Sequence, residues 1–268
     1  MNEIEVTQDG AVLSIQFNRP EKKNAINKGM YASLNAALVR ATQEFDIRVV
    51  VLSGAGDCFT AGNDIFDFAN DIPADESAPG FQFIHNLHNF PKPLIAAVQG
   101  RAVGIGTTAL LHCDAVFAAP DTKFSMPFVT LGLVPEAGSS YLFPKLVGHV
   151  RAAEILLTGR TFTSDEALEI GLINRIEGDP LAEAMKVAHA IASQPPTAVM
   201  NTKALLKSGH HAAVEAVMNA EGELFRIALQ SDEAQAAFMN FLSGKAKKSH
   251  LPEREFSLQV VHVELGLK

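Results

Sequence analysis

Residues 94–108 read LIAAVQGRAVGIGTT, an apolar run followed by a glycine-bearing turn and a second apolar run. The first part, Leu94–Val98, is typical of a short buried strand. The second part continues as an apolar helix through Leu111, and a helix start presents unpaired N–H groups and the positive end of the helix dipole. A Gly-x-Gly turn after a strand mostly serves close packing. The stretch alone therefore leaves a structural and a binding interpretation open.

Working outward from this stretch, strands and helices are expected to alternate along the chain. Apolar or β-branched runs predict strands at Val12–Phe17, Ile47–Leu52 and Ala115–Ala119. Apolar residues from Met30 to Phe45 recur at helical spacing. The order strand, helix, strand, loop, helix, strand predicts an α/β fold. Further helices are expected at 182–191, 197–208 and within 213–242, and an exposed loop at 70–80.

Composition bounds the class of protein. The 268 residues are 47% hydrophobic and 19% charged, as in a compact globular protein. The formal net charge of -8 argues against nucleic acid or an anionic membrane surface as a partner. Cys58 and Cys113 lie far apart, without a disulfide or zinc pattern, and the polar N-terminus lacks the features of a signal peptide. No apolar run reaches the length of a membrane span, so we expect a cytoplasmic protein.

A second glycine turn, Phe59–Ile65, follows the strand that ends near Leu52. Gly62 permits a backbone conformation from which the amides of this turn can point outward. Two such amide clusters can converge on one carbonyl oxygen and stabilise the charge it gains in a transition state, where losing one donor costs about 3–4 kcal/mol. Neither turn matches a dinucleotide fingerprint or a Walker motif.

Glu136 is the one carboxylate between Asp121 and Glu154, within an apolar segment. Burial of that segment would desolvate the side chain and raise its pKa toward the range useful for proton transfer. The alternative is structural, because an acid after Pro135 can sit in solvent or at a helix N-terminus.

Taken together, the chain resembles a known superfamily over about residues 4–248. The resemblance rests on Asn18-Arg19-Pro20 with Asn24-Ala25, on Ala61-Gly62-Asn63-Asp64-Ile65, on Gly100–Gly106 with Cys113-Asp114, on residues 131–138 (LGLVPEAG), and on Leu157-Thr158-Gly159-Arg160 with Ala167 and Gly171-Leu172-Ile173. In their order and spacing these motifs look like those of the crotonase superfamily of enoyl-CoA hydratases and isomerases.

The resemblance implies a fold and an assembly. It implies an α/β spiral of ββα repeats followed by a C-terminal helical trimerisation region, assembled as a homotrimer or a dimer of trimers. Residues 1–195 would form the core with the acyl-CoA site, and residues 196–268 the helical region and tail. The implied pathway is fatty acid β-oxidation. Coenzyme A would be part of the substrate, and no separate cofactor or metal is expected.

The resemblance also implies roles for individual residues. The amides of Asn63 and Ile105 would form the oxyanion hole. Residues implied to bind the CoA part of the substrate are Arg19, Lys22, Ala61, Gly62, Asp64, Ile65, Gly104 and Phe241. Ala61, Asp64 and Ile65 would line the pocket for adenine and pantetheine, and Phe241 would reach the CoA of a neighbouring subunit.

The catalytic acid separates the reactions of the superfamily. Hydratases carry two glutamates at positions that correspond here to Thr108 and Phe128, neither of which can transfer a proton as a carboxylate does. Glu136 stands where the isomerases that convert 3-enoyl-CoA to 2-enoyl-CoA have their single acid. The chain therefore resembles that branch. Residual hydratase activity, thioester hydrolysis, ring isomerisation and dehalogenation remain alternatives, as do a non-catalytic CoA-binding or scaffold trimer and an RNA-binding relative.

Other reactive side chains are weaker candidates for a functional site. His85 and His88 have no third metal ligand spaced with them, so solvated or capping histidines are expected. Cys58 follows Asp57, whose charge raises the pKa of a thiol and disfavours a reactive thiolate.

Overall fold

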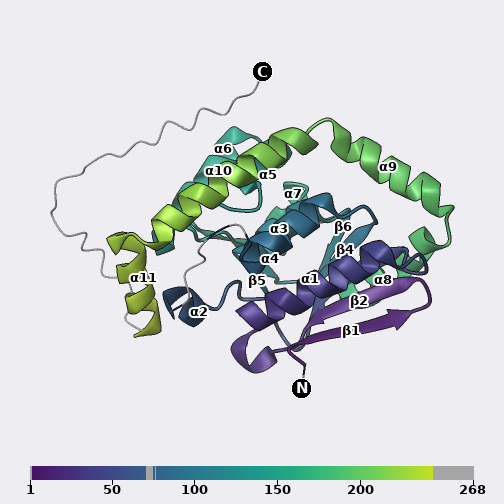
Figure 1. Ribbon diagram of the computed structural model, residues 1–268, viewed down its shortest axis with the longest axis horizontal. Coiled ribbons are helices and arrows are strands. Elements are labelled where there is room, and N and C mark those ends of the chain that lie inside the picture. Colours follow the sequence, from purple (N-terminus) through teal and green to yellow (C-terminus); the bar gives the residue numbers. More distant parts are fainter. Residues whose placement is uncertain (1, 71–74, 76, 244–268) are drawn as a thin grey trace.

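The computed structural model describes residues 2–70, 75 and 77–243 and folds them into two β-sheets surrounded by helices (Figure 1). The strands are β1 (Ile4–Asp9), β2 (Val12–Phe17), β3 (Val49–Gly54), β4 (Leu94–Val98), β5 (Arg101–Val103), β6 (Ala115–Ala118), β7 (Lys123–Ser125), β8 (Thr161–Thr163) and β9 (Arg175–Ile176). The helices are α1 (Lys28–Gln43), α2 (Ile65–Asn70), α3 (Pro79–Asn89), α4 (Ile105–Thr108), α5 (Ser139–Val147), α6 (His149–Thr158), α7 (Ser164–Glu169), α8 (Pro180–Ala192), α9 (Pro196–Ser208), α10 (His211–Leu229) and α11 (Asp232–Leu242). Short 3-10 turns are η1 (Pro20–Lys22), η2 (Ala109–His112) and η3 (Val129–Leu131).

The larger sheet has the strand order β1-β2-β3-β4-β6-β9. Strand β1 is antiparallel to β2, and the neighbouring pairs from β2 to β9 are parallel. Every residue of β3 and β4 is buried. Continuous apolar runs are the sequence signature of parallel strands covered on both faces, which is why these strands show no polar alternation.

Different helices cover the two faces of this sheet. Val49 and Val51 pack toward α8, whose alanines at positions 184, 188 and 192 recur every fourth residue and form one buried stripe. Small side chains let α8 lie close to the strands. Val50 and Leu52 point the other way, into the main core that includes the apolar face of α1.

The stretch at residues 94–108 joins the two sheets. It runs through β4, turns at Gly100, forms β5 and enters α4. Strand β5 pairs parallel to β7, and β7 pairs antiparallel to β8. Gly100 has φ +65°, and a β-carbon there would lie 1.8 Å from the carbonyl oxygen of Asp57. Glycine is required at this crossing because backbone from the preceding repeat occupies the space of a side chain.

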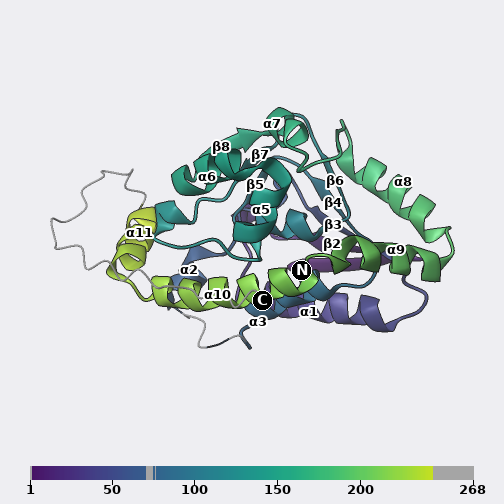
Figure 2. The same ribbon diagram turned by 90° about the horizontal axis from the view of Figure 1, so that it is seen from above.

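The C-terminal helices lie along one side of the core. Helix α10 packs against α5, and α11 packs against α2 and η3 (Figure 2). The helical region expected at 213–242 is therefore two helices. The break falls at Gln230 and Ser231, and Ser231 caps α11 by accepting a hydrogen bond from the amide of Ala234 at 3.2 Å.

Most expected elements are confirmed, with bounds shifted by one or two residues, and the mixed α/β fold is as expected. The expectation that Phe45 belongs to the apolar face of this helix is wrong, because α1 ends at Gln43 and the Phe45 side chain is 76% exposed. Glu44 has extended ψ, which takes the chain out of the helix before Phe45 can reach the buried face. The loop expected at 70–80 falls largely outside the described residues, and α3 begins at Pro79.

None of the helices in the described ranges combines the length and the apolar character that crossing a membrane requires.

Candidate active site

Glu136 lies in the segment between η3 and α5 and is 4% exposed. The hydroxyl of Thr108, at the end of α4, donates a hydrogen bond of 2.5 Å to its Oε1. Burial raises the pKa of Glu136 to about 8. The Thr108 hydrogen bond lowers this pKa, and the charge of Glu221 raises it further. Of the two interpretations that the sequence left open for Glu136, the buried carboxyl group with a raised pKa is therefore the one the structure shows, and the solvated alternative is wrong. A carboxyl group with this pKa can both accept and return a proton near neutral pH.

The backbone of the Glu136 loop is in an unusual conformation. Ala137 has φ +60°, where residues with a β-carbon are strained by about 1–3 kcal/mol. Its carbonyl accepts a hydrogen bond of 2.7 Å from Nε2 of the buried His112 ring, and Ser139 Oγ donates to the carbonyl of Glu136 at 2.6 Å. Burial lowers the pKa of His112 to about 3, so the ring is a neutral donor. These contacts fix the conformation of the loop and hold Ala137 at its strained φ.

The amides of Asn63 and Ile105 are free to bind a ligand. Ile26 and Asn63 form a parallel bridge, in which the Ile26 amide donates to the Gly62 carbonyl and the Asp64 amide donates to the Ile26 carbonyl. The Asn63 amide therefore points to the opposite side, away from Ile26. Ile105 begins α4 and has no acceptor within the helix. Within the described part of the chain, neither amide donates to another residue.

The two glycine turns pack directly against each other. Gly62 has φ +85°, and a β-carbon there would lie 2.6 Å from the carbonyl oxygen of Val103. A β-carbon on Gly106 would lie 2.6 Å from the side chain of Thr60 and 3.2 Å from its carbonyl oxygen. The glycines thus bring the backbone before Asn63 against the backbone before Ile105. That the two amides converge on one ligand atom stays a prediction.

Tyr31 is a member of this site that the sequence does not reveal. It lies on the buried face of α1, and its hydroxyl donates a short hydrogen bond to Oδ1 of Asn63. Burial, together with the negative charge of Glu136, raises the pKa of Tyr31 well above its ordinary value. Tyr31 therefore lies within electrostatic reach of Glu136 while it orients Asn63. Its spacing in the sequence marks it only as part of an amphipathic helix.

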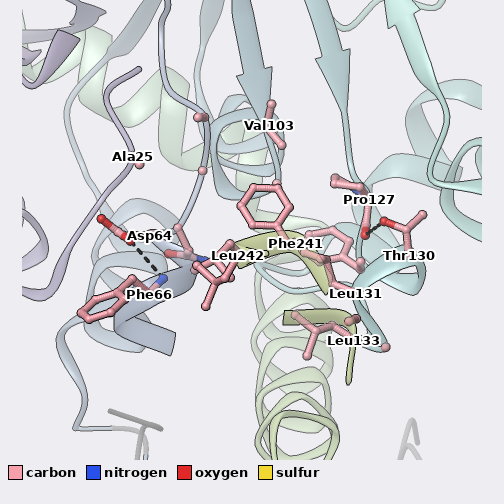
Figure 3. A pocket seen from close by; sticks show the side chains of 18 of the residues that line it. Ala25, Asp64, Phe66, Val103, Pro127, Thr130, Leu131, Leu133, Phe241 and Leu242 are labelled. Carbon is pink, nitrogen blue, oxygen red and sulfur yellow. Dashed lines mark hydrogen bonds between the residues drawn. The ribbon is translucent and has the colours of Figure 1, made fainter. Parts of the chain in front are cut away.

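A cavity of about 1100 Å³ opens beside these turns. Figure 3 shows part of its lining, with Phe241 and Leu242 of α11 among the side chains drawn. The lining includes every residue predicted to bind CoA and the oxyanion-hole residue Asn63, namely Arg19, Lys22, Ala61, Gly62, Asn63, Asp64, Ile65, Gly104 and Phe241. Glu136 and Ile105 are not among the described lining residues. Phe241 lines the cavity of its own chain, and its contact with a neighbouring subunit stays a prediction.

The cations at the cavity differ in their availability. Arg19 is held by Asp64 at 2.7 Å and by Glu3 at 3.1 Å, and Lys23 pairs with Asp57 at 2.7 Å. Lys22 has no ion-pair partner among the described residues. Arg19 thus braces the turn that carries Asp64, and Lys22 is the cation left for an anionic ligand.

The two positions that the resemblance matches to hydratase glutamates hold no carboxylate. Thr108 is fully buried and uses its hydroxyl to bind Glu136, and Phe128 is buried in the core and also lines the cavity. The ring of Phe128 cannot orient a water molecule as a carboxylate does.

The expectation that His88 is solvated or a cap is wrong. His88 is 3% exposed, and its ring lies 4.2 Å from that of His211 and 5.9 Å from that of His112, measured between centroids. Burial lowers its pKa to about 4. The described residues contain no group of three or more potential metal ligands.

Comparison with known proteins agrees with this fold and site. Residues 7–249 match the family model "Enoyl-CoA hydratase/isomerase", and the chain belongs to that family, with the crotonase fold. It is 37% identical over 250 residues to "Enoyl-CoA delta isomerase 2" of Rattus norvegicus, covering 90% of this chain and 64% of that protein. It is 34% identical to "Enoyl-CoA delta isomerase 3, peroxisomal" of Mus musculus, covering 91% of this chain and 80% of that one. The solved structure of Pseudomonas aeruginosa OdaA superposes with a TM-score of 0.88 at 40% identity, covering 90% of this chain and 99% of that one.

The chain thus spans just under two thirds of the length of the rat relative.

Proposed function

We propose that this protein is an enoyl-CoA isomerase that moves a double bond from 3-enoyl-CoA to 2-enoyl-CoA. One observation carries the proposal: Glu136 is a buried carboxyl group with a pKa of about 8, while the hydratase positions hold Thr108 and Phe128. Double-bond migration relocates one proton and needs one acid-base group, whereas hydration must also orient and deprotonate water. The names of the rat and mouse relatives support the same reaction.

In the proposed mechanism the thioester oxygen binds between the amides of Asn63 and Ile105. These donors stabilise negative charge on the oxygen and so acidify the protons at C2. The Glu136 carboxylate removes one C2 proton, and the electron pair of that C–H bond enters the dienolate. The double bond then shifts to C2–C3 as the Glu136 carboxyl group returns the proton to C4. No atom is gained or lost, and the carboxylate is regenerated.

The substrate is proposed to be an acyl-CoA thioester. Ala61, Asp64 and Ile65 lie on the wall of the cavity, where they suit contacts with adenine and pantetheine. Lys22 supplies a free cation for a phosphate group, and Phe241 adds an aromatic face. Because the reaction has no redox step and no net addition, we propose that no cofactor or metal is needed besides the CoA of the substrate.

We also propose a homotrimer or a dimer of trimers that acts in fatty acid β-oxidation in the cytoplasm. Large apolar side chains are exposed on α6 and α9, where Val150, Leu157, Leu205 and Leu206 are each more than 70% exposed. Such side chains favour burial against another subunit. The two unpaired cysteines suit a reducing compartment.

The test compares the wild type with Glu136→Gln on a 3-enoyl-CoA and, separately, on a 2-enoyl-CoA in water. We expect the wild type to isomerise the first substrate and Glu136→Gln to lose about 10²- to 10⁴-fold in kcat, as for a lost general acid-base group. Glu223→Gln, an exposed change on α10, is the matched control. Rapid hydration of the 2-enoyl-CoA without isomerisation would show that the reaction is wrong. Full activity of Glu136→Gln would show that the base is wrong.

A further inference from the structure

Glu221 is a second buried carboxylate that the proposed mechanism does not use. It lies on α10 and is 6% exposed. Its Oε2 accepts a hydrogen bond from the Gly138 amide at 2.6 Å, and its Oε1 accepts from the Ser140 amide at 2.8 Å and from Ser140 Oγ at 2.5 Å. Burial raises the pKa of Glu221, and these three donors oppose that rise by stabilising the charged form.

A buried carboxylate is costly to stability unless its oxygens are satisfied, and well-packed apolar residues often serve as well or better. The hydrogen-bond partners of Glu221 show its role in this protein. Helix α5 begins at Ser139, and Gly138 at its N-cap has no side chain to accept from the free amides. Glu221 supplies the missing cap from another helix. Its negative charge also lies at the positive end of the α5 dipole.

The two amides that donate to Glu221 belong to residues that closely follow Glu136, the proposed base. Gly138 is two residues from Glu136, and the linking residue Ala137 is the strained one, so two successive residues have left-handed φ values of 60° and 70°. A β-carbon on Gly138 would lie 2.9 Å from the Val214 side chain and 3.3 Å from that of Met218, which brings the loop close against α10. The Glu136 loop is thus clamped to α10 by close packing and by three hydrogen bonds to one side chain.

We propose that Glu221 is a positioning residue that fixes the Glu136 carboxylate for proton transfer between C2 and C4 of the substrate. The inference rests on the proposed isomerase function. It makes the C-terminal helical region a functional part of the active site, because α10 sets the conformation of a loop that lies some 80 residues earlier in the chain.

Glu221 has an electrostatic effect as well as a geometric one. Its charge raises the pKa of Glu136, after the larger effect of burial. The other groups that face Glu136 are Thr108 from α4, which donates a hydrogen bond, and Tyr31 from α1, whose own pKa responds to the Glu136 charge. Removing the charge of Glu221 alone should therefore lower the pKa of Glu136.

The test uses Glu221→Gln in the full-length protein, with Glu223→Gln on the same helix as the charge-matched control. Glutamine keeps the shape of the side chain, but its NH₂ group cannot accept from either amide. We expect kcat on a 3-enoyl-CoA to fall about 10- to 100-fold with KM changed less than about twofold, as for a misplaced catalytic group. The rise of kcat/KM with pH should move to lower pH in Glu221→Gln and stay in place in Glu223→Gln.

A milder pair of variants keeps the test decisive if Glu221→Gln does not fold. Ser140 is exposed, and Ser140→Ala removes one of the three hydrogen bonds while Ser140→Thr keeps the hydroxyl. We expect Ser140→Ala to lose about 2- to 10-fold in kcat and Ser140→Thr to recover it.

The two proposals fail in different ways. If Glu136→Gln is inactive but the folded Glu221→Gln and Ser140→Ala variants keep the kcat and pH profile of the wild type, the role of Glu221 is overturned and the proposed function stands. If Glu221→Gln is unfolded and Ser140→Ala equals Ser140→Thr in kcat, the role is likewise overturned. If the wild type does not isomerise a 3-enoyl-CoA, both proposals fall together.

Discussion

At the scale of single residues, the proposed chemistry depends on how the protein sets the proton affinity of one carboxyl group. Burial is the main cause of the raised pKa of Glu136, and the Thr108 hydroxyl counteracts it. The hydroxyl stabilises the ionised carboxylate, the form that accepts the first proton in the proposed mechanism. Thr108, which the resemblance matches to a hydratase glutamate, donates a hydrogen bond to Glu136 in this protein.

This balance predicts a pH dependence. Since Glu136 acts first as a base, kcat/KM should rise with pH and level off above its pKa of about 8. Thr108→Val removes the hydrogen bond that lowers this pKa, so the rise should move to higher pH. The measurement is the pH–rate profile of both proteins, with the exposed Thr202→Val as a control. A profile of Thr108→Val that coincides with that of the wild type would contradict the role of the hydroxyl.

Sequence reasoning finds Glu136 but not the residues around it. An acid in an apolar, glycine-flanked segment can be buried with a raised pKa or can lie in solvent, and the structure shows the first of these. Tyr31 and Glu221 bind groups 32 and 81 or more residues away, and each occupies an ordinary position in an amphipathic helix. Such pairings depend on how distant elements pack, which local spacing does not encode.

At the scale of elements, the two glycine turns decide whether the amides of Asn63 and Ile105 lie together. Gly62→Ala places a β-carbon 2.6 Å from the Val103 carbonyl oxygen at φ +85°. We expect the free energy of unfolding to fall by at least about 1–3 kcal/mol, and kcat to fall because the Asn63 amide is displaced. Urea denaturation and steady-state kinetics measure the two effects.

Gly178→Ala is the control for this variant, because a β-carbon on Gly178 meets nothing within 4 Å. Equal stability and kcat in the two alanine variants would mean that the close approach at Gly62 has no structural or catalytic importance.

The longer elements could be predicted from sequence, and the short ones could not be placed individually. Strand β4 is a continuous apolar run, and β2 alternates apolar residues with Ser14 and Gln16, so the existence of both strands follows from local pattern. The strands β5, β7 and β8 have three residues each, too few to show a periodicity. They exist because backbone from neighbouring repeats supplies their hydrogen-bond partners.

At the scale of the whole molecule, the buried acid should link stability to pH. The pKa of Glu136 is about 8 in the folded protein and 4.5 for the free group, so the folded state binds more protons between these values. Stability contributed by this group is therefore lost as pH rises through this window.

Glu136→Gln removes the cost of ionising a buried carboxyl group in the folded protein at high pH. Its free energy of unfolding relative to the wild type should increase by on the order of 3–5 kcal/mol between about pH 5 and about pH 9. Denaturant titrations of both proteins at several pH values give the difference, in which the titration of other groups largely cancels. A difference that stays constant, or that shrinks toward high pH, would show that Glu136 is ionised at low pH in the folded state.

The short helical segment 105–112 has a further consequence for how the site holds its dimensions. It begins with the Ile105 amide, carries the Thr108 hydroxyl that binds Glu136, and ends with the His112 ring that binds the Ala137 carbonyl. The Ile105 amide lies at the start of the segment, and Thr108 and His112, four residues apart, both contact the Glu136 loop. The length of the segment fixes how far the Ile105 amide lies from the Glu136 carboxyl group, the two groups to which the proposed mechanism gives separate roles. One inserted residue would rotate one end relative to the other by about 100° and separate the two functions, even if every side chain were retained.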